Sequence, residues 1–289
     1  MSEFAKRTLF GALYVVCVVG SILSNAFVYA GLFCVICLLA VDEFHRLMKS
    51  SGKIRIFAAI CTLLLWIIIQ CIAWRTEAGF EYLQLGLILG LAYLCVCMIA
   101  LLDEIWNHSG QPLQNWGNFL ISQGMLALPL ATMSFIYFLD KWLLLALFVL
   151  IWVNDSGAYC VGSLTAKRPQ GNHKMSPHIS PKKSWEGLLG GFAFTIAASL
   201  ILWACDWYDV IVTRHSGLLI AFLFAFLVSA FGTMGDLMES LIKRSVGVKD
   251  SGMFLPGHGG VLDRFDSIIL ASPVIAAFCW LCYFIAPLL

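Results

Sequence analysis

The chain has 289 residues, of which 61% are hydrophobic and 12% are charged, with a formal net charge of +1. A soluble domain carries about 25% charged residues, so this composition excludes an ordinary soluble domain and indicates a polytopic membrane protein. The balanced charge and the absence of a Lys/Arg-rich tract give no indication of nucleic-acid binding.

The apolar runs predict an all-α protein that crosses the membrane about nine times. The first run has no small-residue cleavage site after it and is interpreted as a retained anchor. Region 8–41 is too long for one span, and Ser24 with Asn25 predicts a turn between two short helices. The runs are 8–24, 26–41, 57–74, 82–102, 119–138, 141–153, 187–205, 217–235 and 268–288.

The distribution of Lys and Arg predicts the orientation of these helices, because cytoplasmic loops carry an excess of both. The cations gather before the first run, between the second and third runs, in 154–186 and in 236–267. Nine spans with a cytoplasmic N-terminus and an external C-terminus place all four segments in the cytoplasm. The loop 103–118 also falls there, but it has no Lys or Arg and gives no support.

Eleven cysteines are present, and almost all lie inside apolar runs. The pairs Cys34/Cys37 and Cys279/Cys282 have a spacing seen in zinc and redox sites. Neither pair has polar neighbours, so we interpret them as helix-packing residues.

The motif-like polar sequence lies almost entirely in 152–267. We therefore predict an N-terminal membrane region for packing and oligomerisation, 1–150, and a catalytic region with cytoplasmic loops, 151–289. The first polar cluster, Trp152–Gly162, follows an apolar helix and contains Asp155 and Tyr159. Asp155 fits either an interfacial or capping residue or a helix that enters a site.

The second cluster, His173–Gly187, places Lys182 and Lys183 before a helix that Ser184 can cap. Cations beside a helix N-terminus predict a phosphate site. A basic segment that orients the helix and touches anionic lipid headgroups fits the same residues, and the sequence leaves both interpretations open.

The third cluster begins where an apolar helix becomes polar. Asp236, Ser240 and Lys243 lie at i, i+4 and i+7, on one helical stripe. Ionisable groups at such a depth normally line a polar cavity or pair with one another. A glycine-rich loop follows, and the chain re-enters the membrane through Asp263. Two carboxylates from separate helix ends, near phosphate-binding cations, suit Mg²⁺-assisted phosphoryl transfer.

The segment "SLIKRSVGVKDSGMFLPGHGGVLDRFDS" resembles the signature of the phosphatidate cytidylyltransferases, also called CDP-diacylglycerol synthases. "NDSGAY" and "SPKKSWEG" resemble further family segments, so the likeness covers about 152–267, whereas the first 150 residues match only in hydropathy. The fixed positions of the signature are all met: Ser240, Lys243, Arg244, Lys249, Asp250, His258, Gly259, Gly260, Asp263, Arg264 and Asp266.

The resemblance implies an integral membrane nucleotidyltransferase of phospholipid biosynthesis. Its substrates are CTP and phosphatidic acid, and its products are CDP-diacylglycerol and pyrophosphate. The resemblance also implies Mg²⁺, with room for a second cation, and a homodimer whose polar cavity opens to the cytoplasm and laterally to lipid. The short chain, without a long polar N-terminal extension, predicts the plasma membrane of a bacterium, with the active site facing the cytoplasm.

The residues and the resemblance together give each candidate a role. Asp236 and Asp263 are the predicted metal ligands, and Asp266 is either a third ligand or the partner of Arg264. The catalytic set adds Ser240, Lys243, Arg264 and His258. The substrate-binding set is Lys182, Lys183, Lys249, Arg244, Asp155, Tyr159, Gly259 and Gly260.

Two other functions stay open. A related membrane cytidylyltransferase or kinase acting on another lipid, such as an isoprenoid phosphate, would share the nucleotide motifs. A transporter would use Asp236 and Asp263 as a cation or proton relay, but the polar motifs lie on one predicted membrane side and no inverted repeat is visible.

Overall fold

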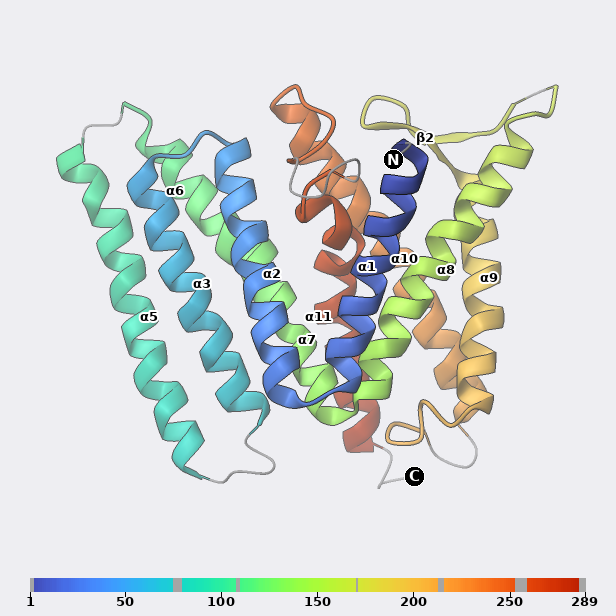
Figure 1. The fold of residues 1–289 in the computed structure, drawn as a ribbon, viewed down its shortest axis with the longest axis horizontal. Coiled ribbons are helices and arrows are strands. Elements are labelled where there is room, and N and C mark those ends of the chain that lie inside the picture. The colour runs from blue at the N-terminus through green and yellow to red at the C-terminus, as the bar shows by residue number, and fades with distance from the viewer. Residues whose placement is uncertain are drawn as a thin grey trace. The chain divides into compact units, whose positions relative to one another are not determined.

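The computed structural model describes residues 3–74, 80–107, 110–169, 171–212, 216–252 and 259–285 (Figure 1). Within these ranges the chain is almost entirely helical, and eight helices are long and apolar enough to cross a membrane. A shorter apolar segment, Thr8–Leu23, precedes them. The predicted all-α polytopic membrane architecture is therefore confirmed. The count of nine spans and their orientation stay predictions.

The chain packs as two units, and unit 1 comprises Met1–Phe138 and Val246–Phe265. Asn25 caps the second helix, because its side chain accepts hydrogen bonds from the amides of Phe27 and Val28 at 3.1 and 3.0 Å. This cap confirms the predicted turn, but the helices on either side, of 21 and 22 residues, are longer than the short helices predicted. The helices of unit 1 are α1 (Glu3–Leu23), α2 (Ala26–Leu47), α3 (Gly52–Ala73), α5 (Phe80–Asn107), α6 (Pro112–Ile121), the π-helical turn η1 (Ser122–Ala127) and α7 (Leu128–Leu139).

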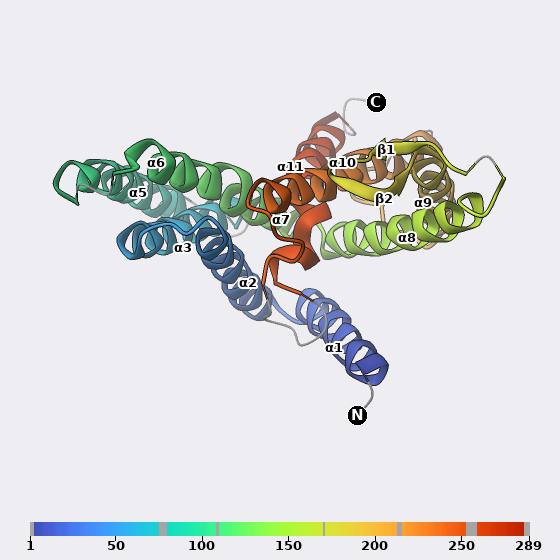
Figure 2. The same cartoon turned by 90° about the horizontal axis from the view of Figure 1, so that it is seen from above.

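Unit 2 comprises Leu139–Ser245 and Asp266–Leu289. Glycines bring two of its helices close together: a Cβ on Gly191 would lie 2.8 Å from the Asn154 carbonyl oxygen. The β-hairpin covers the ends of α8 and α9 (Figure 2). The elements of unit 2 are α8 (Lys141–Thr165), β1 (Lys174–Ser176), β2 (Ser180–Ser184), α9 (Trp185–Ala204), α10 (Gly217–Ser245) and α11 (Leu262–Ile285), which enters the unit at Asp266.

The two packing units do not follow the order of the sequence, because the segment Val246–Phe265 packs with the N-terminal helices. The signature motif is thereby divided between the units. The predicted functional division at residue 150 stays a prediction.

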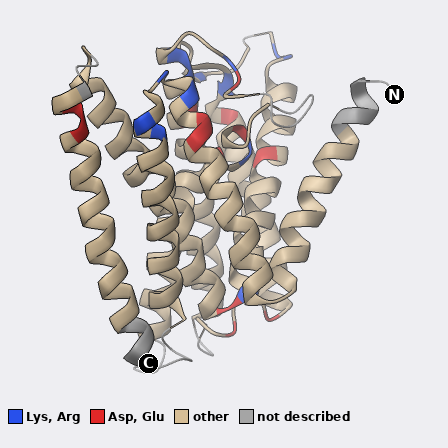
Figure 3. Cartoon of the chain, turned by 60° about the vertical axis from the view of Figure 1, so that its left-hand side comes forward, with Lys and Arg blue, Asp and Glu red and all other residues tan. Residues whose placement is uncertain are grey.

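Most of the Lys, Arg, Asp and Glu residues of each unit lie toward one end of the helices (Figure 3). In unit 1, Lys53 Nζ lies 3.4 Å from Asp103 Oδ1, so the start of α3 and the end of α5 share that end. Glu43, near the end of α2, accepts a hydrogen bond from the amide of Val261 at 2.7 Å. Three segments predicted to be cytoplasmic therefore lie together within unit 1.

The cysteines differ in burial, and four of them, Cys37, Cys61, Cys71 and Cys279, are buried. All eleven are free thiols, and Cys37 and Cys279 are buried inside α2 and α11. Among the described residues, no group of three or more His, Cys, Asp or Glu side chains is arranged to hold a metal. The burial of Cys37 and Cys279 is consistent with a packing role for one member of each Cys-x-x-Cys pair.

Candidate active site

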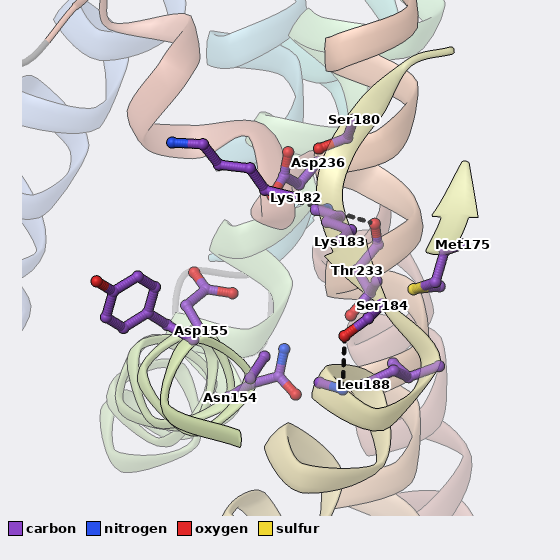
Figure 4. Close-up of a pocket in the computed structure, with 13 residues that line it drawn as sticks. Asn154, Asp155, Met175, Ser180, Lys182, Lys183, Ser184, Leu188, Thr233 and Asp236 are labelled. Carbon is purple, nitrogen blue, oxygen red and sulfur yellow. Dashed lines mark hydrogen bonds and ion pairs between the residues drawn. The ribbon is translucent and has the colours of Figure 1, made fainter. Parts of the chain in front are cut away.

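A cavity of about 380 Å³, lined by both charged and apolar side chains, lies within unit 2 under the β-hairpin and at the charged end of the helices (Figure 4). It contains five of the residues predicted from the sequence. Its wall consists of Asn154, Asp155, Ala158, Tyr159, Met175, Ser180, Lys182, Lys183, Ser184, Gly187, Leu188, Thr233 and Asp236.

Helix α8 supplies Asp155 and Tyr159, and its neighbour Asn154 fixes this helix against the others. The Asn154 side chain is buried, and its Oδ1 accepts hydrogen bonds from Ser229 Oγ at 2.7 Å and Thr195 Oγ1 at 3.5 Å. Because Asn154 is bound to α9 and α10, the next side chain along α8, Asp155, projects toward the cavity (Figure 4). Asn154 lies in the "NDSGAY" motif but is absent from the predicted site set.

The β-hairpin brings a cation to α10. Lys183 Nζ lies 2.7 Å from Asp236 Oδ2 and donates a hydrogen bond to the Thr233 carbonyl oxygen at 3.3 Å. The side chains of Lys183 and Asp236 keep 21% and 29% exposure, so a ligand in the cavity can reach both. Lys182 also lines the cavity, but its side chain extends in another direction (Figure 4).

The N-terminus of α9 lies beside these lysines. Ser184 caps it as predicted, accepting a hydrogen bond from the Gly187 amide at 3.1 Å. The positive end of a helix and an adjacent lysine pair make an anion-binding surface. Glu186, in the first turn, accepts a hydrogen bond from His173 Nδ1 at 2.6 Å on the exposed side of the hairpin.

The predicted stripe on α10 is present, although its members have different partners. Ser240 Oγ donates to Asp236 Oδ1 at 3.4 Å, which joins the first two members. Lys243 pairs with Glu239 at 2.5 Å, and both side chains are buried, at 10% and 1% exposure. Arg244 Nε donates to the Ile179 carbonyl oxygen of the hairpin at 3.2 Å. The sequence interpretation overlooked Glu239 as the partner of Lys243, although the i, i+4 spacing of opposite charges indicates the pair.

Helix α11 contributes Asp266 to the same end of unit 2. A Cβ on Gly235 of α10 would lie 2.5 Å from the Asp266 carbonyl oxygen, so these two helices approach closely. The carboxylate of Asp266 lies within electrostatic range of Asp236, Glu239 and Asp155. Acidic groups from three helices therefore meet near the cavity, where Lys183 and Lys243 balance part of their charge.

The remainder of the signature lies in unit 1. Asp263 Oδ2 accepts hydrogen bonds from the amides of Ser251 and Gly260 at 3.0 and 2.8 Å. Gly259 has φ +83°, a left-handed conformation that favours glycine. Lys249 is exposed, as is Asp250.

The carboxylate of Glu43 meets the same segment and is missing from the predicted site set. It accepts hydrogen bonds from Ser251 Oγ and from the Val261 amide. Its sequence context, "VDEFHR" at the end of an apolar run, is that of an ordinary interfacial residue.

Several predicted roles are neither confirmed nor contradicted. His258 lies outside the described residues. Arg264 belongs to unit 1, where its carbonyl oxygen accepts a hydrogen bond from Tyr14 at 3.4 Å, whereas Asp266 belongs to unit 2. Asp236 and Asp263 likewise belong to different units, and their joint role as metal ligands stays a prediction.

Comparison with known proteins finds relatives whose names denote nucleotide-transferring enzymes. The sequence model described as the cytidylyltransferase family matches residues 5–282. A phosphatidate cytidylyltransferase of Pseudomonas aeruginosa is 35% identical over 233 residues, covering 72% of this chain and 82% of the relative. A phosphatidate cytidylyltransferase of Staphylococcus epidermidis is 40% identical over 148 residues, covering 49% of this chain and 52% of the relative. The chain thus spans about half the length of the staphylococcal relative.

Proposed function

Because the chain belongs to the cytidylyltransferase family, we propose that it transfers CMP from CTP to phosphatidic acid, giving CDP-diacylglycerol and pyrophosphate. The observation that carries this proposal is the cavity of unit 2, where Lys183, Asp236 and the N-terminus of α9 meet at one end of a membrane-spanning bundle. Curated relatives named phosphatidate cytidylyltransferase support the choice of substrates.

The binding step follows from the charges in the cavity. Lys183 is held by Asp236 and by the Thr233 carbonyl oxygen in the structure. A triphosphate that enters the cavity gives this ammonium group stronger anionic acceptors, and the amides at the start of α9 add further donors. Lys182, on the same strand, contacts a second phosphate group. Tyr159 and Asp155 on the opposite wall orient the nucleoside.

The chemical step is a phosphoryl transfer at the α-phosphorus of CTP. An oxygen of the phosphatidate phosphate forms a bond to that phosphorus, the bond to the bridging oxygen of the β-phosphate breaks, and pyrophosphate leaves. The attacking phosphate is already an anion near neutral pH, so little general-base help is needed. Catalysis therefore consists of positioning and charge neutralisation.

The oxygen donors in the site fit Mg²⁺, which prefers one or two carboxylates and completes its coordination with substrate phosphates and water. Asp236 and Asp263 are the proposed ligands, and Asp266 is either a third ligand or the partner of Arg264. When bound, the ion would neutralise the charge that develops on the phosphates. Partial exposure of Asp236 in the cavity is consistent with this role.

The remaining signature residues receive roles by resemblance. Ser240 orients Asp236, with which it shares a hydrogen bond. Lys243, Arg244, Lys249 and Arg264 supply positive charge to phosphates. Gly259 and Gly260 allow close backbone approach, and His258 donates to pyrophosphate.

We place the active site on the cytoplasmic face of a bacterial plasma membrane, with the N-terminus inside and the C-terminus outside. The grouping of cationic segments within each unit supports this orientation under the positive-inside rule. We further propose a homodimer, on the basis of the family resemblance. Chemical crosslinking in native membranes would test the dimer, and recovery of the monomer alone after crosslinking would contradict it.

The central test uses purified protein in mixed micelles with CTP labelled in the α-phosphate, Mg²⁺ and phosphatidic acid. We expect labelled CDP-diacylglycerol, and none when phosphatidic acid is omitted. Label transferred to an isoprenoid phosphate instead would favour the related lipid cytidylyltransferase. A complete lack of CMP transfer with either lipid would favour the transporter.

A further inference from the structure

A carboxylate from a helix more than two hundred residues earlier in the chain joins two described stretches of the signature segment in unit 1, one ending at Gly252 and the other beginning at Gly259. Glu43 on α2 accepts a hydrogen bond from Ser251 Oγ, before the glycine-rich stretch, and another from the Val261 amide, after it. The backbone amide of Leu262 also interacts with this carboxylate. One side chain thus joins both ends of the segment.

This contact is buried. Glu43 is 9% exposed, Ser251 8% and Val261 5%. Burial of a carboxylate is costly unless its oxygens are hydrogen-bonded, and here each oxygen has a donor from the signature segment. The contact is therefore specific, because few other arrangements of the segment would satisfy the two oxygens.

The glycines of the segment fit closely around Glu43. A Cβ on Gly252 would lie 2.8 Å from Glu43 Oε1, and a Cβ on Gly260 would overlap both Glu43 and Ser251. Gly252 and Gly260 thus leave room for the carboxylate. This packing gives Gly260 a role in addition to the predicted approach to phosphate.

Glu43 also compensates for a missing helix cap. Helix α11 begins at Leu262, and the residue before it, Val261, has no side chain that can accept hydrogen bonds from the first amides. Glu43 provides the acceptor from another helix, and its negative charge is favourable beside the positive end of α11. The first turn of that helix contains Asp263 and Arg264, so Glu43 fixes the direction in which both residues leave the loop.

A second carboxylate completes the arrangement. Asp263 Oδ2 accepts hydrogen bonds from the amides of Ser251 and Gly260, the same two residues that surround Glu43. We infer that Glu43 is a positioning residue of the active site, which clamps the signature segment so that Asp263 and Arg264 are presented correctly. This inference rests on the proposed function for its catalytic part, whereas the clamp itself is a property of unit 1.

The test compares Glu43→Ala with Glu43→Gln. Glutamine can accept from the Val261 amide and donate to the Ser251 hydroxyl, so it preserves both contacts. We expect Glu43→Ala to lower kcat by roughly 10- to 100-fold with a smaller change in the KM for CTP, as for residues that orient metal ligands. Glu43→Gln should recover most of this loss.

The matched control is Glu104→Ala. Glu104 is another buried carboxylate of unit 1, 6% exposed, and it accepts a hydrogen bond from Asn115 Nδ2 at 2.7 Å. Glu104→Ala should lower the thermal stability of the protein. Its kcat, measured at a temperature where the variant is folded, should equal that of the wild type. A parallel fall of kcat in Glu104→Ala and Glu43→Ala would overturn the inference, because it would indicate general destabilisation.

Hydrogen exchange supplies a readout that needs no substrate. The amides of Ser251, Gly260 and Val261, which are hydrogen-bonded in the structure, should lose protection in Glu43→Ala and keep it in Glu43→Gln, whereas amides of α5 should be unchanged. Ser251→Ala, which removes one donor, should give an intermediate loss if Glu43→Ala does not fold. Unchanged protection in both variants would refute the clamp. Failure of the wild type to transfer CMP would refute the proposed function while leaving the exchange result interpretable.

Discussion

The carboxylate of Asp236 in unit 2 meets a lysine side chain, whereas the carboxylate of Asp263 in unit 1 accepts hydrogen bonds from two backbone amides. A lysine side chain can rotate away and bind a phosphate without moving the main chain. Backbone amides cannot leave their acceptor unless the segment refolds. Unit 2 therefore holds its carboxylate in a way that permits ligand exchange, and unit 1 holds its carboxylate in a way that fixes a loop.

The same contrast applies to the neighbouring acids. Glu43 accepts from a hydroxyl and a backbone amide of the signature segment, whereas Glu239 pairs with Lys243 on its own helix. Two regions that contribute to one sequence signature thus stabilise their charges by different means. Substituting the corresponding carboxylates of the two units can therefore separate the contribution of each carboxylate to catalysis from its contribution to stability.

The largest expected effect is on turnover. Asp236→Asn and Asp263→Asn should each lower kcat by at least about 100-fold, because the neutral amide cannot balance a cation or organise phosphates. Asparagine retains an oxygen acceptor, so both variants should insert into membranes and melt near the wild-type temperature. The assay is CMP transfer to phosphatidic acid, and substantial activity in either variant would refute the metal-ligand role of that residue.

The next effect concerns the exchangeable cation. Lys183→Met should lower kcat/KM for CTP by roughly 10- to 100-fold, the loss of one or two charge-assisted hydrogen bonds. Lys182→Met, on the same strand, should have a smaller effect, because only Lys183 pairs with Asp236 among these two lysines. Steady-state kinetics with varied CTP gives the comparison. Equal losses of kcat/KM in the two variants would show that pairing with Asp236 does not distinguish the lysine that binds phosphate.

A third comparison measures stability. Asp263→Ala removes the acceptor of two backbone amides, so the free energy of unfolding should fall by about 1–3 kcal/mol. Asp236→Ala should change it less, because Lys183 keeps the Thr233 carbonyl oxygen as an acceptor and is partly exposed. Thermal unfolding in detergent, followed by thiol labelling of the buried cysteines, checks both. A larger loss in Asp236→Ala would reverse the distinction between the two units.

The smallest expected effect is the loss of an exposed ion pair at the end of α2. Arg46 pairs with Asp42 at 2.8 Å, but its side chain is 68% exposed. Arg46→Ala should therefore lower the free energy of unfolding by only about 0.2–1 kcal/mol. Arg55 is 33% exposed and donates to the same carboxylate through two nitrogens. Arg55→Ala should therefore lower the free energy of unfolding by more than Arg46→Ala does. The same unfolding assay serves here, and a loss for Arg46→Ala as large as that for Asp263→Ala would contradict the ranking.

Much of the site could be predicted because its residues are local in sequence. Ser184 as a helix cap, the stripe formed by Asp236 and Ser240, and the turn at Asn25 follow from spacings of two to four residues, which helix geometry fixes. The meeting of Lys183 with Asp236 was not determined in this way, because 53 residues separate them (236 − 183) and a hairpin brings them together. The two lysines of "SPKK" are equivalent in the sequence, and only the direction of the strand distinguishes them.

The sequence by itself determined the membrane class, the approximate spans and the family, because hydropathy and a long signature at fixed spacing do not depend on how helices pack. Only the tertiary structure decided that Glu43 is the acceptor for the ends of the signature segment and that Lys243 is buried against Glu239. It also decided that Val246–Phe265 belongs to the N-terminal unit. The physical reason is that a buried carboxylate must find its donors, and these can lie anywhere along the chain that folding brings within about 3 Å.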